Sequence, residues 1–202
     1  MAAGDGTWRE YDAVELPRVL QGALEAFAEQ GYHGASIREL AARAGLSVPG
    51  LYHHHASKQD ILRALLDAVL TDLLRRCTDA LASTGDHPAE RFDALVECLL
   101  RFHMFRTEHA FVATSELRSL TPANREHVVG LRDALQHLLD DVVEEGAADG
   151  TFTTPYPKAA SRGVATLCLG VASWYRPDGP LSPDELVRRH LTLARGIVNG
   201  RD

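Results

Sequence analysis

Residues 36–58 read SIRELAARAGLSVPGLYHHHASK, the most informative segment of the sequence. The stretch predicts two short helices joined by a tight turn. Ser36 can cap the first helix, and Glu39 three residues later completes a capping box. Gly45 stands where the first helix must end, at a position that favours a residue tolerant of positive φ. Ser47 can cap the second helix. A short helix, a turn containing glycine and a second short helix form the helix-turn-helix unit, which places its second helix in the major groove of DNA.

The last nine residues of this stretch carry a specific motif. Residues 50–58, GLYHHHASK, resemble the signature that ends the helix-turn-helix of the TetR family of bacterial transcriptional regulators, and Phe27–Tyr32 match the same family's pattern. The resemblance covers residues 16–66, about a quarter of the chain. Two positions depart from the family's pattern. Ser36 replaces the usual threonine and keeps its hydroxyl, whereas His55 replaces a phenylalanine of the core.

The resemblance implies which side chains contact DNA. Phosphate contacts fix the register on the duplex, and base contacts supply the sequence preference. Tyr52 has an alternative interpretation as a residue packed on the core with its hydroxyl in water, and Lys58 as a solvated surface charge. We expect His55 to be packed rather than in contact with DNA. The predicted base contacts are Ser47, Val48, Gly50, His53 and His54, and the predicted phosphate contacts are Ser36, Tyr52 and Lys58.

The charge distribution agrees with a single DNA-binding patch. The net charge is −7, which argues against a protein coated by nucleic acid. No carboxylate lies between Ser47 and Lys58, however, while three histidines and a lysine gather there. A local surface without acids on an acidic protein predicts modest, salt-dependent DNA binding by each subunit.

Metal binding and catalysis find little support in the sequence. Consecutive helical residues point about 100° apart, so three histidines in a row cannot converge on one ion. None of the ten histidines has a carboxylate three residues before it, as helical metal centres require. Cys98 and His103 lie five residues apart, a poor spacing for a nucleophile and its base. We therefore expect no metal, no cofactor and no enzymatic activity.

The chain as a whole predicts an all-α protein of about nine helices. Hydrophobic residues make up 45% of it, enough for a sizeable core, and no stretch alternates as a strand would. The acidic opening residues contain no apolar run, and the weakly polar run 163–175 is too short to span a bilayer. We expect a cytoplasmic protein that does not enter membranes. The expected domains are a flexible arm over 1–14, the helix-turn-helix domain over 15–60, and an effector-binding and dimerisation domain over 61–202.

The helices of this expected larger domain can be placed from their caps and breakers. Ser57 caps a long helix that continues toward Leu81, long enough to link the two domains rigidly. Thr121 with Pro122 starts another long helix, and Ser182 caps the last one. The predicted ranges are 16–30 for the first helix, then about 58–81, 89–107, 110–119, 121–148, 158–174 and 183–198 after the helix-turn-helix.

Family resemblance places a ligand cavity among the later helices. Arg162 and Arg118 are the most informative candidates there, since a buried arginine needs an anionic partner. Residues 172–183 are similar to a segment of TetR-type regulators of lipid and steroid breakdown, which sense acyl-CoA thioesters. An acyl-CoA effector is therefore the leading expectation. For each candidate an ordinary place in the core or on the surface is equally open. The ligand candidates are Phe102, Phe105, Arg106, Phe111, Arg118, Arg162, Thr166 and Trp174.

The last two helices have patterns suited to self-association. Small residues form a stripe on the first of them, and the second carries a heptad-like seam. Their alternative is packing within one protomer. We expect a homodimer that binds a palindromic operator and, as a repressor, releases it when a small-molecule effector binds. A helix-turn-helix protein without an effector, or a helical-bundle enzyme, are the alternatives, and the sequence does not separate a repressor from an activator. The stripe is Ala159, Gly163, Thr166 and Gly170, and the seam is Leu186, His190, Leu193 and Ile197.

Overall fold

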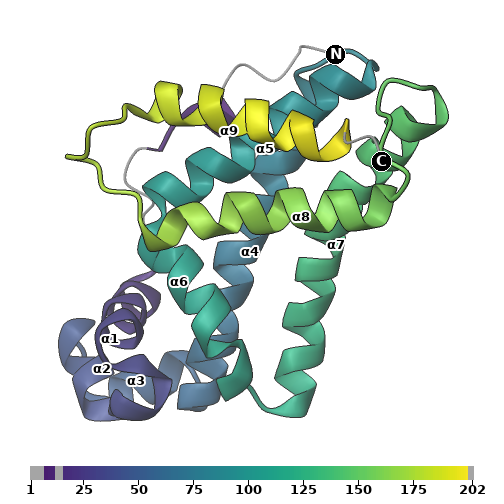
Figure 1. Cartoon of the computed structure of the whole chain (residues 1–202). Coiled ribbons are helices and arrows are strands. Elements are labelled where there is room, and N and C mark those ends of the chain that lie inside the picture. Colours follow the sequence, from purple (N-terminus) through teal and green to yellow (C-terminus); the bar gives the residue numbers. More distant parts are fainter. Residues whose placement is uncertain (1–6, 12–15, 200–202) are drawn as a thin grey trace. The chain divides into compact units, whose positions relative to one another are not determined.

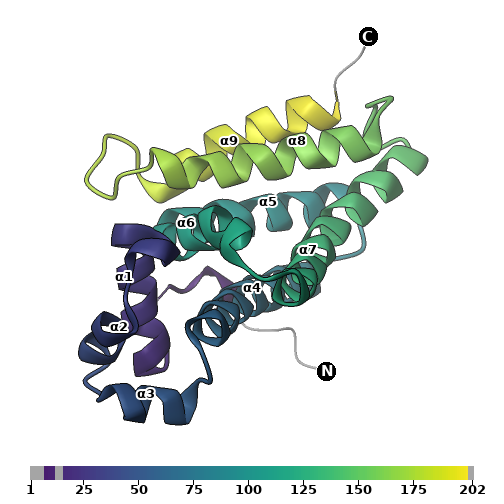
Figure 2. The same cartoon turned by 90° about the horizontal axis from the view of Figure 1, so that it is seen from below.

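The computed structural model describes residues 7–11 and 16–199, and over these it is all-α, as expected (Figures 1 and 2). Three short 3-10 helices, η1, η2 and η3, accompany nine α-helices within the described ranges. The elements in chain order are η1 (Thr7–Arg9), α1 (Arg18–Gly34), α2 (Ile37–Arg43), α3 (Val48–His54), α4 (Lys58–Ala82), α5 (Pro88–Phe105), α6 (Thr107–Ser115), η2 (Glu116–Ser119), α7 (Pro122–Ala148), α8 (Pro157–Gly170), η3 (Val171–Ser173) and α9 (Pro183–Val198).

Side-chain caps fix the helix-turn-helix where the sequence predicts them. The Ser36 hydroxyl accepts from the Glu39 N–H at 3.2 Å, and the Ser47 hydroxyl accepts from the Gly50 N–H at 3.2 Å. Gly45 has a φ of 68°, which a residue with a side chain rarely adopts. Its position therefore ends α2 and leads the chain into the cap of α3.

Several helix boundaries differ from the predicted ones for local reasons. The first helix continues past Gln30 to Gly34 as one element, although Gly31 breaks its regular geometry with a φ of 72°. The predicted helix 110–119 begins earlier, at Thr107, and its last four residues form η2. The predicted helix 158–174 ends at Gly170 and continues as η3.

The described chain divides into two compact units. Unit 1 combines residues up to Tyr11 with 73–107 and 133–202, and unit 2 combines 12–72 with 108–132. The long helices α4 and α7 each contribute residues to both units.

Unit 2 contains the helix-turn-helix and its supporting helix. Phe27 of α1, Leu40 of α2 and Leu51 of α3 are each 0% exposed, so the three helices share one core. Such fully buried side chains each contribute roughly 1.5–3 kcal/mol of hydrophobic stabilisation. That core fixes which face of α3 points outward.

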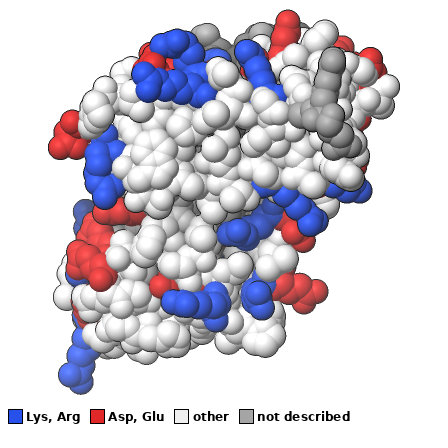
Figure 3. All heavy atoms as spheres, in the orientation of Figure 1, with Lys and Arg blue, Asp and Glu red and all other residues white. Residues whose placement is uncertain are grey.

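In unit 1, α8 and α9 lie side by side and both contact α5 (Figures 1 and 2). Figure 3 shows a broad area over α8 that carries few charged groups. Leu169 of α8 and Leu193 of α9 are 36% and 56% exposed and add apolar area to this surface. None of the described helices combines the length and the apolar character that crossing a membrane requires.

The residues expected to form a flexible N-terminal arm are described only in part. Residues 1–6 and 12–14 lie outside the described ranges. Trp8, within the expected arm, is 1% exposed and therefore part of the core of unit 1. The segment 7–11 thus differs from the expected flexible arm.

Candidate nucleic-acid interface

Helix α3 has one face in the core and one in solvent. Leu51 is 0% exposed, whereas Tyr52 is 48% exposed and His53 and His54 are also exposed. The rings of His53 and His54 meet edge to face with centroids 5.7 Å apart, and His55 turns away to another partner. No group of metal-binding side chains comes together among the described residues. The outward face of α3 can therefore offer hydrogen-bond donors and acceptors to a groove.

The two capping serines occupy opposite ends of the turn, and both are exposed. Each hydroxyl oxygen accepts a backbone N–H of its own helix, which leaves its proton available to an external acceptor. Val48 and Gly50, which were predicted to face base edges, are half-buried. A base edge could reach them only by close approach to the first turn of α3.

Lys58 is held more firmly than a solvated surface charge. Its ammonium donates to the Ala35 carbonyl at 2.6 Å and lies 4.3 Å from the centroid of the Tyr32 ring. Burial lowers the pKa of Lys58, and the Glu116 carboxylate partly opposes that shift. An ammonium has three donors, so the bond to Ala35 leaves two for a phosphate. The Lys58 side chain, at the first position of α4, is thus held against the end of α1.

Residue 59, which the sequence did not single out, anchors the start of α4. The Gln59 amide donates to the Ser119 carbonyl at 2.7 Å, and its oxygen accepts from the Thr121 N–H at 3.0 Å. Both partners belong to the corner between η2 and α7, within unit 2. The side chain therefore ties that corner to the end of the helix-turn-helix. Such a pairing joins positions about sixty residues apart, so no local pattern could have indicated it.

The two arginines of α2 differ in whether they form ion pairs. Arg43 is surrounded by Glu25, Glu29 and Glu39, with ion-pair distances of 3.8, 2.5 and 3.0 Å, and its charge is neutralised within unit 2. Arg38 is exposed and forms no ion pair with any described carboxylate. The sequence reasoning did not single out this exposed cation, which lies two residues after the Ser36 cap.

His55 is packed, in agreement with its expected role. Its Nδ1 lies 3.2 Å from a carboxylate oxygen of Asp60, and only 17% of its side chain is exposed. Although burial acts in the opposite direction, hydrogen bonds from Arg63 and His55 lower the pKa of Asp60. The position that holds an apolar ring in the family thus forms a polar contact here, between the end of α3 and the first turn of α4.

The eight ligand candidates are divided between the two units. Phe111 and Arg118 belong to unit 2 and the others to unit 1. Phe102 is buried at 2% exposure, whereas Phe105, Phe111 and Trp174 are 39%, 54% and 48% exposed. The arginines expected to be buried, Arg118 and Arg162, are both exposed, as is Thr166, and Arg106 is half-buried.

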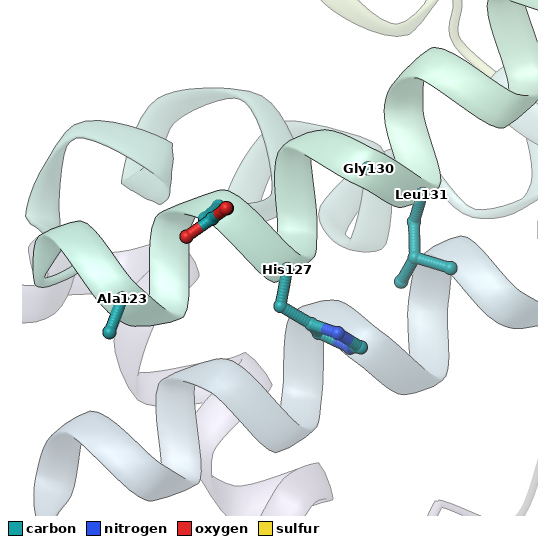
Figure 4. A pocket seen from close by; sticks show the side chains of 5 residues that line it. Ala123, His127, Gly130 and Leu131 are labelled. Atoms are coloured by element: carbon teal, nitrogen blue, oxygen red, sulfur yellow. The ribbon is translucent and has the colours of Figure 1, made fainter.

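Two cavities of unit 2 can be compared with the predicted ligand residues. One of about 410 Å³ is formed by Arg118 with residues 30–33 and the buried Glu116. The other, of about 460 Å³, runs along α7 (Figure 4). There the His127 ring points toward α4, and its Nε2 lies 2.6 Å from an Asp67 oxygen. Apart from Arg118, none of the predicted ligand residues lines either cavity.

Comparison with known families finds a match for each of two parts of the chain. Residues 19–65 match the family described as bacterial regulatory proteins, tetR family. Residues 85–198, more than half of the chain, match the tetracyclin repressor-like C-terminal domain. The first match covers the helix-turn-helix, and the second covers α5 to α9.

Individual relatives agree with this assignment. The HTH-type transcriptional repressor KstR2 of Mycobacterium tuberculosis (strain ATCC 25618 / H37Rv) is 29% identical over 200 residues, covering 97% of this chain and 96% of the relative. The TetR family transcriptional regulator PfmR from Thermus thermophilus is 30% identical, with a TM-score of 0.78 over 92% of this chain and 99% of that one. The structure of AibR in complex with isovaleryl coenzyme A and operator DNA has a TM-score of 0.78 over 91% of this chain and 97% of that one, but only 19% identity, a likeness of fold.

The geometry and the comparisons lead to one conclusion. A capped helix-turn-helix with an exposed, acid-free second helix is followed by helices of the matching C-terminal type. Relatives over nearly the full length are transcriptional regulators rather than enzymes. The chain belongs to the TetR family of bacterial transcriptional regulators, and it is a DNA-binding regulator of transcription.

Proposed function

We propose that the protein is a dimeric repressor that binds a palindromic operator and releases it when a small-molecule effector binds. The observation that carries this proposal is the outward face of α3, which presents polar side chains and no carboxylate. Repressor action is supported by the name of the KstR2 relative. The cytoplasm, where the operator DNA lies, is the proposed place of action.

The proposed DNA contacts keep the predicted assignment. Ser47, Val48, Gly50, His53 and His54 face base edges, whereas Ser36, Tyr52 and Lys58 hold phosphates. The exposure of Tyr52, His53 and His54 supports this assignment, and the free donors of Lys58 support its phosphate role. We add Arg38 as a phosphate contact because it is exposed on α2 close to the Ser36 cap.

The proposed dimer interface is the α8–α9 face, defined here by the small-residue stripe of α8 together with Leu193 of α9. Ala159, Thr166 and Gly170 of the stripe are exposed, so the stripe is open to a second helix. In the seam of α9, Leu186 is 0% exposed and packs within unit 1, whereas Leu193 is 56% exposed. The interface is therefore centred on α8 and the middle of α9. Two copies related by a twofold axis would present two α3 helices to one face of DNA.

An acyl-CoA thioester is the proposed effector class. The solved AibR structure, which shares the fold, contains isovaleryl coenzyme A together with operator DNA. A coenzyme A thioester carries several phosphate charges, for which Arg106 and Arg162 are the suitable candidates in unit 1. Release of the operator requires only that the effector bind one state about 1–3 kcal/mol more tightly than the other. The unbroken helix α4 is the proposed carrier of that change, since it begins at Lys58 and has residues in both units.

Two measurements together test this proposal. Fluorescence anisotropy of the labelled upstream region of the protein's own gene reports DNA binding, with and without a panel of acyl-CoA thioesters. Calorimetric titration of the same thioesters into the free protein reports effector binding directly. We expect DNA binding that one class of thioester abolishes. DNA binding that no thioester disturbs, with no heat of thioester binding, would leave a regulator without this effector, the alternative that the sequence kept open.

A further inference from the structure

The segment Trp8–Tyr11, which we call the strap, is docked onto unit 1 by its aromatic side chains. Trp8 is 1% exposed, and its indole N–H donates to the Ser83 hydroxyl at 3.3 Å. The Tyr11 ring stacks on Phe105 with centroids 5.1 Å apart. A short segment that buries its largest side chain completely is a structural part of the unit rather than a loose tail.

The main chain of the strap is fixed as well. Arg76 of α4, itself 5% exposed, donates to the carbonyls of Trp8 at 3.1 Å and Glu10 at 2.8 Å. The same guanidinium lies 4.2 Å from the centroid of the Tyr11 ring. Outside, Arg9 forms two hydrogen bonds to Glu97 of α5, at 2.9 and 2.8 Å. Side chains and carbonyls of the strap thus share one set of anchors within unit 1.

The position of the strap in the chain gives these contacts a second consequence. Residues 12–15 connect Tyr11 to Leu16, and α1 begins at Arg18. Five residues of extended chain span at most about 17 Å. Because Tyr11 is docked on unit 1, Leu16 can move no farther than that from the docking site of Tyr11. At its other end the helix-turn-helix continues directly into α4, whose residues from 73 onward belong to unit 1. The DNA-binding helices are therefore connected to unit 1 at both ends.

We infer that the docked strap positions the DNA-binding helices for the operator, with Trp8 and Arg76 as its positioning residues. This inference rests on the proposed operator binding. Two recognition helices of a dimer must match half-sites about 34–36 Å apart, or a multiple of that spacing. A helix-turn-helix held at one end only has more freedom to lose when it binds, whereas one held at both ends is preorganised. The strap itself contacts no DNA in this account.

A change of tether length tests the inference without disturbing any strap contact. Inserting eight Gly and Ser residues between Asp12 and Ala13 leaves Trp8–Tyr11 intact but lengthens the possible span from about 17 Å to about 45 Å. The matched control carries the same insertion between Gly6 and Thr7, before the strap. Operator binding is measured by anisotropy over a range of salt concentrations. We expect operator affinity to fall about tenfold for the insertion after the strap, and to stay within about twofold for the control.

Fluorescence of Trp8 reports whether the strap stays docked. Trp8 and Trp174 are the only tryptophans of the sequence, so all proteins carry Trp174→Phe to leave one signal. We expect the emission of a buried indole in both insertion variants, unchanged when DNA is added. A salt dependence equal to that of the parent protein is also expected, since no phosphate contact is lost. A lower salt slope for the insertion after the strap would mean that the arm itself binds phosphates, and it would overturn the inference.

The remaining outcomes separate this inference from the proposed function. If the variant with the insertion after the strap bound the operator normally while Trp8 stayed buried, the strap would serve only the packing of unit 1. That result would overturn the inference. Absence of operator binding by the parent protein would instead refute the proposed function. A point variant adds a second line of evidence. Trp8→Phe should retain most operator affinity because it keeps an aromatic ring in the core. Trp8→Ala, once circular dichroism has verified its fold, should lose as much operator affinity as the variant with the insertion after the strap.

Discussion

Helices α3 and α9 both display basic side chains, but only those of α9 lie beside carboxylates. On α9, Arg188 and Arg189 both pair with Glu185, and Arg195 pairs with Asp93 of α5. Around α3 the sequence holds no carboxylate between Glu39 and Asp60. Exposed ion pairs add little stability, yet they cancel the local field. The basic side chains of α9 have their counter-charges within the protein, whereas no acidic residue near α3 would repel an external anion such as a DNA phosphate.

The same two regions differ in what else they expose. The α8–α9 face has exposed leucines and small residues, while α3 exposes hydroxyl, phenol and imidazole groups. An apolar surface with few charges suits a second protein chain, and a polar surface without acids suits a nucleic acid.

The largest effect is expected from Gly170→Arg on the α8–α9 face. A Cβ at Gly170 would meet no other atom within 4 Å in the protomer, so the variant should fold normally. An arginine there would block a partner helix, and sedimentation should show a monomer. Operator affinity should fall more than about 100-fold because a dimer gains that much from linked binding. Gly130→Arg on α7 is the matched control, since its Cβ is equally unobstructed. A dimeric Gly170→Arg variant would contradict the proposed interface.

The next largest effect is expected when a carboxylate is placed on α3. His54→Glu should weaken operator binding about 100-fold. A carboxylate carried into the groove lies between two rows of phosphates; like charges brought close together cost several kcal/mol, and each 1.4 kcal/mol is about a factor of ten. His137→Glu, at an exposed position of α7, is the control for the added charge. Anisotropy with labelled operator measures both variants. Equal affinities for the two would show that α3 does not face the DNA.

A smaller effect is expected from two of the proposed phosphate contacts, Tyr52 and Lys58, which differ in charge. Tyr52→Phe removes one hydroxyl, and Lys58→Ala removes a cation; each should weaken operator binding about five- to tenfold. Only Lys58→Ala should also reduce the slope of log K against log salt, by about one. Circular dichroism verifies folding, since Lys58 also binds the Ala35 carbonyl. Unchanged binding in both folded variants would refute the phosphate assignment.

The smallest effect concerns the acid stability of unit 1. Burial alone would raise the pKa of Glu97, but hydrogen bonds from Arg9 and Arg101 outweigh it and hold the pKa below the usual range of a glutamate. A lowered pKa means that this carboxylate stabilises the folded state above its unfolded pKa and that the contribution is lost as pH falls through the folded pKa. Between about pH 6 and about pH 3.5 the free energy of unfolding should therefore drop more for the parent than for Glu97→Gln. Urea denaturation measures the free energy of unfolding at each pH. Equal losses for the parent and for Glu97→Gln would show that Glu97 does not contribute to acid stability.

Much of the fold follows from short-range chemistry, which is why the sequence could predict it. The hydroxyl caps Ser36, Ser47 and Ser182 each bond a backbone N–H three residues later, and each stands where the pattern placed it. Pro122 begins α7 as predicted. Such signals need only neighbouring residues, so the sequence predicts the helix-turn-helix and α9 to within a residue or two.

Long-range contacts were beyond such local signals. Trp8 stands alone among polar residues with no periodic pattern, so its burial against α5 could not be inferred. Gln59 bonds residues about sixty positions away. The expected burial of Arg118 and Arg162 came from family resemblance rather than from neighbours, and both are exposed. The contents of an effector site depend on how distant helices meet, which residue types do not encode locally.

Footprinting of the DNA upstream of the protein's own gene would reveal whether paired α3 helices read an operator. Two protected half-sites should appear, related by a palindrome and separated by one helical turn or a multiple of it. Protection should vanish with His54→Glu and persist with His137→Glu. Absence of any protected site at low salt, or protection that His54→Glu leaves unchanged, would contradict the account.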